Sequence, residues 1–85
     1  MGDLKREIET RYAAICSQVD EAAGSDREDD ALRAAFAELA AMMIAYQYRE
    51  GARDALQAAL SRDQGRNANR TSLAERARAL IDANR

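Results

Sequence analysis

The run from Ala34 to Tyr48, AAFAELAAMMIAYQY, constrains the fold more than any other segment, because only Glu38 and Gln47 interrupt its apolar character. A surface helix carries one apolar stripe, whereas a helix that is apolar on nearly all sides is usually buried on several of them. The chain has only 85 residues with which to bury such a helix, close to the lower limit for a self-sufficient core. We therefore expect part of this helix to contact a partner, either a second copy of the chain or another protein.

The composition of the whole chain predicts one all-α domain over residues 1–85. Proline, histidine and tryptophan are absent, and alanine and arginine are abundant. Strands favour alternating β-branched and aromatic residues, and no segment has that pattern. Residues that favour helices dominate instead.

A first helix is predicted over residues 4–23. Asp3 is placed to accept hydrogen bonds from the free N–H groups at its start, and Gly24 is placed for the left-handed residue that commonly follows a helix. Apolar residues recur at steps of three and four, which puts them on one face. These residues are Leu4, Ile8, Tyr12, Ile15 and Val19.

A second helix is expected to begin near Asp26, because Ser25 and Glu28 have the spacing of a capping box. Gly51 then leaves two alternatives. We favour one long helix over residues 26–62, bent at Gly51, because the segment after the glycine is strongly helical and an internal glycine costs only about 1 kcal/mol relative to alanine. The alternative is a break at Gly51, which would give four helices in all.

Residues 63–71 have the composition of a loop, and Ser72 with Glu75 suggests a second capping box before a last helix over residues 73–84. Each half of the long central helix would then be covered by one antiparallel neighbour. Such an arrangement is only two helices thick, so we expect homodimerisation to complete a helical bundle. The interface residues predicted on this basis are Met42, Met43, Ala45, Tyr48, Ala52 and Leu56.

Tyr46 and Tyr48 project in different directions from one helix. Tyrosine and methionine are enriched at protein interfaces, so we expect Tyr48 to be a contact residue at the rim and Tyr46 to belong to the core. The competing interpretation is that both rings complete the intramolecular core.

The residues offer little for catalysis. Without histidine the chain has no histidine base and no histidine metal ligand, and its isolated glycines form no phosphate-binding loop. Cys16 is expected to be a buried, inert thiol. The acidic residues 26–30 suit a helix start and lack the alternating ligands and central glycine of a calcium loop. We therefore expect no enzymatic activity, no cofactor and no metal.

Charge is unevenly distributed along the chain. Residues 1–50 contain six Lys/Arg and eleven Asp/Glu, whereas residues 51–85 contain seven arginines and four Asp/Glu. The arginines favour either an ordinary solvated surface or contacts to an anionic partner such as a nucleic acid. The small net negative charge argues against a nucleic-acid footprint. The candidate contacts are Arg62, Arg66, Arg70, Arg76 and Arg78.

The first residues show no signal-peptide pattern, and the apolar run is shorter than the ~20 residues that span a bilayer, so we expect a cytoplasmic protein. The sequence predicts a non-enzymatic helical module, dimeric by the packing argument above, that binds a larger protein as an adaptor or inhibitor. A nucleic-acid-binding regulator is the alternative. In size, helical simplicity and Ala/Arg bias the chain resembles phage- or plasmid-encoded accessory proteins, including inhibitors of bacterial defence systems, although no motif carries that resemblance.

Overall fold

The computed structural model describes residues 3–62 and 68–83, and in these ranges the chain forms four helices and no strand. The all-α prediction is confirmed. The helices are α1 (Asp3–Ala22), α2 (Glu28–Tyr46), α3 (Ala52–Arg62) and α4 (Ala68–Ala83).

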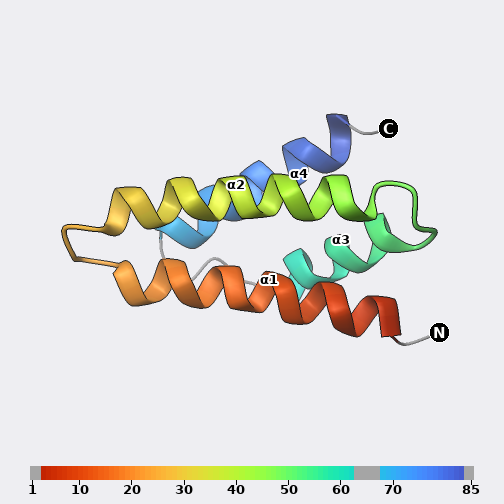
Figure 1. Ribbon diagram of the computed structural model, residues 1–85, viewed down its shortest axis with the longest axis horizontal. Helices are drawn as coiled ribbons and strands as arrows, with labels where there is room; N and C mark the ends of the chain where they lie inside the picture. The colour runs from red at the N-terminus through yellow and green to blue at the C-terminus, as the bar shows by residue number, and fades with distance from the viewer. Residues whose placement is uncertain (1–2, 63–67, 84–85) are drawn as a thin grey trace.

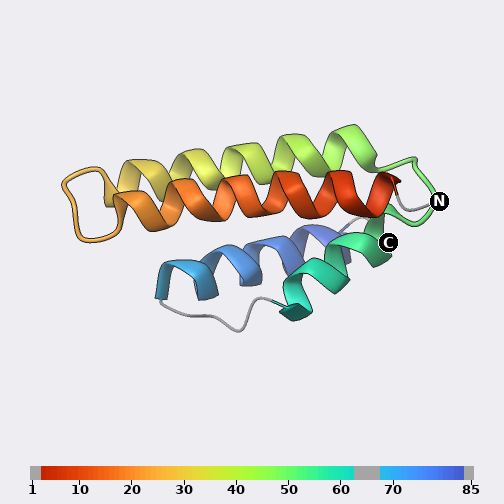
Figure 2. The same ribbon diagram turned by 90° about the horizontal axis from the view of Figure 1, so that it is seen from below.

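The helices form two layers. α1 and α2 lie side by side as an antiparallel pair, and α3 and α4 form the second layer beneath them (Figures 1 and 2). α1 packs against α2 and α3, while α2 packs against α4. The core between the layers is built from apolar and aromatic side chains, the largest fully buried of which are Ile8, Val19, Leu39, Met42, Leu56, Leu60, Leu73 and Ile81.

The turn from α1 to α2 differs from the predicted capping box. Gly24 has the expected positive φ of 80°, but the Ser25 N–H donates to the Ala22 carbonyl and so closes α1 instead of opening α2. The Glu28 carboxylate accepts from the Gly24 N–H at 2.7 Å, and Ser25 Oγ accepts from the Arg27 N–H at 3.2 Å. The second helix consequently begins at Glu28, later than expected.

The favoured continuous helix over residues 26–62 is wrong, and the alternative break at Gly51 is found. α2 ends at Tyr46, the Arg49 N–H donates to the Tyr46 carbonyl at 3.0 Å, and α3 begins at Ala52. Gly51 has a φ of 85°, which a continuous helix does not allow. The break lets α3 fold back onto α1, so that its apolar face is buried by the chain itself; this tertiary gain outweighs the local preference for helix. The residues buried in this way are Ala52, Ala55, Leu56, Ala59 and Leu60.

We expect the substitution Gly51→Ala to lower the free energy of unfolding by about 1–2 kcal/mol, because an L-residue with a side chain is strained at positive φ. A Cβ at position 51 would meet no atom within 4 Å, so the cost is conformational and not steric. Gly51→Asn is the matched control, because asparagine tolerates the left-handed region better. Urea unfolding followed by circular dichroism measures both. Equal stability of the wild type and Gly51→Ala would contradict the broken helix.

The last helix begins earlier than predicted. α4 starts at Ala68, so Ser72 and Glu75 lie inside it and the predicted second capping box is wrong. Residues 68–71 of the expected loop are helical, and residues 63–67 lie outside the described ranges. The early start is consistent with the contact of Arg70 to Asp20 of α1 at 2.7 Å, which ties the first turn of α4 to the bundle.

Candidate protein-interaction surface

α2 is apolar on two opposite faces. Its inward face packs into the bundle core, and the side chains on this face are almost fully buried. Leu39 has none of its surface exposed and Met42 has 1%. The inward face consists of Ala35, Leu39, Met42, Met43 and Tyr46.

The opposite face of α2 points to solvent. Residues 34, 37, 41, 44 and 48 are separated by three or four positions, so they follow one side of the helix and continue into the turn after it. Ile44 is 67% exposed and Tyr48 is 92% exposed, and both are large apolar or aromatic side chains. The remaining members are alanines, all of them exposed. We call this set, Ala34, Ala37, Ala41, Ile44, Ala45 and Tyr48, the outward face of α2.

Polar residues border the outward face, and Asp30, one turn before Ala34, is exposed in line with it. Arg33 and Glu38 are exposed beside it, and by helix geometry they project well to either side of the line through Ala34 and Ala41. An exposed apolar stripe along a helix is a candidate interaction site.

The structure divides the six predicted interface residues into two groups. Met42, Met43, Ala52 and Leu56 are buried in the chain's own core, so the expectation that this side stays uncovered is wrong for them. The reason is the break at Gly51, which supplies α3 as an intramolecular cover. Ala45 and Tyr48 are exposed, and their role in an interface stays a prediction.

The two neighbouring tyrosines have different environments, as expected. Tyr46 is 7% exposed and Tyr48 is 92% exposed, so the interpretation that both rings lie in the core is wrong. The guanidinium carbons of Arg11 and Arg49 lie 5.5 Å and 5.6 Å from the Tyr46 ring centroid, within range for cation–π attraction. Arg11 Nη1 also donates to Tyr46 Oη at 3.3 Å. This hydrogen bond raises the pKa of Arg11, which is protonated at neutral pH in any case.

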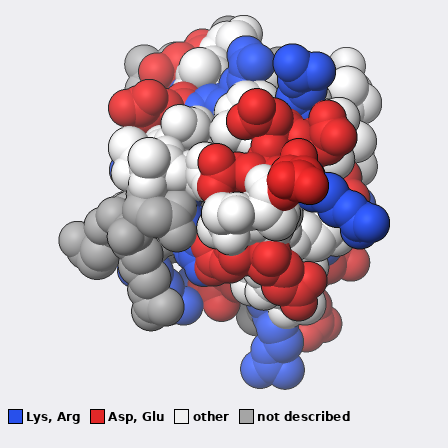
Figure 3. All heavy atoms as spheres, turned by 90° about the vertical axis from the view of Figure 1, so that its left-hand side faces the viewer, with Lys and Arg blue, Asp and Glu red and all other residues white. Residues whose placement is uncertain are grey.

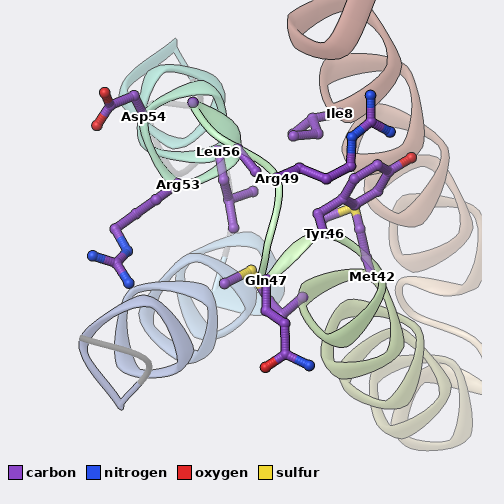
Figure 4. A pocket seen from close by; sticks show the side chains of 11 residues that line it. Ile8, Met42, Tyr46, Gln47, Arg49, Arg53, Asp54 and Leu56 are labelled. Atoms are coloured by element: carbon purple, nitrogen blue, oxygen red, sulfur yellow. The ribbon is translucent and has the colours of Figure 1, made fainter.

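A pocket of about 290 Å³ opens where α2 turns into α3 (Figure 4). Its floor is apolar: Leu56 points into it from α3, and Met42 and Ile8 line it from α2 and α1. Arg49 crosses its rim toward Tyr46, whereas the Arg53 side chain extends away from the centre. Gln47, Arg49, Arg53 and Asp54 add polar groups to its lining, so the pocket is of mixed character.

The arginines predicted to meet an anionic partner are mostly engaged within the chain. Arg70 makes a two-pronged contact with the Asp20 carboxylate, with its Nε at 3.1 Å and its Nη2 at 2.7 Å. Arg62 lies 3.1 Å from Glu9, and the Arg76 guanidinium lies 4.8 Å from the Phe36 ring centroid. Arg78 lines a shallow groove with residues of α3, and Arg66 is outside the described residues. Nucleic-acid binding stays a prediction, and these contacts do not favour it.

Acidic side chains gather at the end of the molecule where α1 runs into α2, with basic residues around them (Figure 3). Among residues 3–62 and 68–83, no group of three or more Cys, Asp and Glu side chains has the geometry to hold a metal ion.

The predicted burial of Cys16 is confirmed, with 2% of its surface exposed.

The sequence predicted the excess of apolar residues on α2, but it assigned some buried residues to the exposed side. It missed Ala34, Ala37 and Ala41. The usable signal was side-chain size: the stripe that contains Leu39 and Met42 offers more area to bury than the stripe of alanines on the opposite side.

Comparison with known proteins finds no matching family model, curated protein or solved structure. Across the described residues, none of the four helices combines the length and apolarity that crossing a membrane requires. In the residues that the structure describes, fold and surface together define a small four-helix arrangement in which α2 is apolar on both its buried and its exposed side.

Proposed function

We propose that this protein is a non-enzymatic protein-interaction module that binds through the outward face of α2. The single observation that carries the proposal is the exposure of Ile44 and Tyr48 at the end of a continuous row of exposed alanines. Burying that row against another protein would remove apolar surface from water, at about 25 cal/mol for each Å². Ile44 and Tyr48 are the natural anchors, because they are the largest side chains on the face.

The chemistry of the sequence supports binding over catalysis. The chain has no histidine, its thiol is buried, and the pocket at the α2–α3 turn has an apolar floor. A module of this kind acts by occupying a surface, as an adaptor that joins two proteins or as an inhibitor that blocks one. We extend the proposal to assembly as a homodimer and to a larger protein partner in the cytoplasm.

Affinity capture from the native proteome tests the proposal. We expect proteins retained by the wild type to be lost with Ala41→Asp, which puts a charge in the middle of the outward face, and to be kept with Ala79→Asp, which makes the same change on an exposed position of α4. Circular dichroism establishes that both variants are folded. Retention of the same proteins by wild type and Ala41→Asp would overturn the proposed binding surface.

A further inference from the structure

We propose that the turn over residues 47–51 is a hinge at which α3 and α4 can be exchanged between two copies of the chain, and that Gly51 keeps the wild type in its closed form. In the exchanged dimer, α3 and α4 of each copy pack on α1 and α2 of the other copy. The inference does not rest on the proposed function, because the outward face of α2 takes no part in the exchange.

The boundary between the two layers is also the boundary of the exchanged unit. Among the described helices, the chain passes from the layer of α1 and α2 to the layer of α3 and α4 at residues 47–51 (Figures 1 and 2). The contacts across this boundary join α1 to α3 and α4, and α2 to α4. A second copy can supply all of them. Exchange therefore conserves the buried core, and the two forms differ mainly in the turn and in the entropy lost on association.

The turn itself buries little, since residues 47–51 are all exposed. Gln47 still has right-handed helical backbone, with φ −59° and ψ −29°. Gly51 has a φ of 85°, whereas no described residue other than glycine has a positive φ. Arg49 ties the turn to Glu7 of α1 at 3.6 Å, but both side chains are about half exposed, so this ion pair contributes little. The left-handed backbone of the closed turn thus depends on Gly51.

A side chain at position 51 would shift the balance toward exchange. An L-residue is strained at positive φ, which penalises the closed turn by a factor of about 5–30 in each chain. Alanine also favours helical backbone over glycine, which stabilises the straightened turn. A dimer contains two such turns, so we expect Gly51→Ala to raise the dimerisation constant at least about thirtyfold. The stability loss expected for this variant applies at low concentration, where the chains are single.

Sedimentation equilibrium tests the hinge in chains that also carry Ala41→Asp, which removes association through the outward face. We expect Gly51→Ala to form dimers in this background, with an unchanged helical spectrum. Gly24→Ala is the matched control, because Gly24 has a φ of 80° and open space around a Cβ. Straightening that turn would break the hydrogen bond from the Gly24 N–H to the Glu28 carboxylate, so the control should stay at the mass of one chain.

An ion pair between the layers reports exchange directly. Arg70 of α4 contacts Asp20 of α1 at 2.7 Å. Asp20→Arg in one chain puts two like charges at this contact, and so does Arg70→Asp in another. Exchange between these two chains places the new arginine against the new aspartate and reunites the two original residues. Native mass spectrometry of the mixture, in chains that also carry Gly51→Ala and Ala41→Asp, should therefore show heterodimer in excess over random pairing.

Each outcome decides the proposal. A protein with Gly51→Ala and Ala41→Asp that keeps the mass of one chain at all concentrations would overturn it, and so would equal dimerisation of the Gly24→Ala control. Random pairing of the charge-reversed chains would indicate a dimer without exchange and would also overturn it. If Gly51→Ala abolishes folding, the charge-reversed chains are refolded together with Gly51 intact. Excess heterodimer would then support the hinge, and chains that stay single would contradict it.

Discussion

Replacing Leu39 by alanine is expected to lower the free energy of unfolding by about 2–5 kcal/mol, because the substitution leaves a cavity in the core in addition to the lost burial. Leu39 is fully buried on the inward face of α2. A domain of this size has a total stability near the lower end of the usual range of about 5–15 kcal/mol. The variant should therefore be partly unfolded at modest temperature.

Ile44→Ala is the matched control for Leu39→Ala, since both remove a large aliphatic side chain from the same helix. Ile44 is 67% exposed, so we expect its replacement to change stability by no more than about 0.5 kcal/mol. Both variants are compared by urea unfolding at low protein concentration, where association contributes little. A larger loss for Ile44→Ala than for Leu39→Ala would mean that α2 is rotated relative to the structure described.

The second large effect concerns the adjacent residues Met42 and Ala41, which project about 100° apart from α2, Met42 into the core and Ala41 to solvent. Met42 is 1% exposed, and Met42→Asp would place a carboxylate in the core without a partner. An unsatisfied polar group costs roughly 2–7 kcal/mol, and a charge costs more. We expect Met42→Asp to abolish cooperative folding, as shown by loss of the sigmoidal thermal transition in circular dichroism.

Ala41→Asp adds the same charge one residue earlier, where the side chain is exposed. Its effect on folding should be limited to the difference in helix propensity, about 0.5–1 kcal/mol. The variant should keep the helical spectrum and the cooperative transition of the wild type. Unfolding of Ala41→Asp at low concentration, or a well-folded Met42→Asp, would show that the inward and outward faces of α2 are reversed.

The parts of the fold that the sequence predicted correctly depend on local periodicity. Ile8, Tyr12 and Val19 recur with the helical period on one face only. This spacing was enough to predict α1 and its buried face. Gly24 ended that helix in the left-handed conformation, as its position indicated. The different environments of Tyr46 and Tyr48 were also predicted correctly, since residues that are two apart in a helical sequence project about 200° apart.

The errors arose where local preferences were nearly balanced and tertiary contacts decided the outcome. The segment around Gly51 can extend a helix or break it at a cost of about 1 kcal/mol, and the burial of Leu56 and Leu60 against the rest of the chain favours the break. The orientation of α2 was ambiguous for a related reason: apolar residues occupy both of its sides, so periodicity alone could not select Met42 as buried and Ala41 as exposed.

Sedimentation equilibrium on the wild type and Ala41→Asp over a wide concentration range tests most directly whether the outward face of α2 is an association surface. We predict that the wild type approaches twice the 9.4 kDa chain mass as concentration rises, while Ala41→Asp stays at the mass of one chain with an unchanged helical spectrum. A wild type that remains at the mass of one chain throughout, or an Ala41→Asp variant that dimerises as the wild type does, would contradict the account.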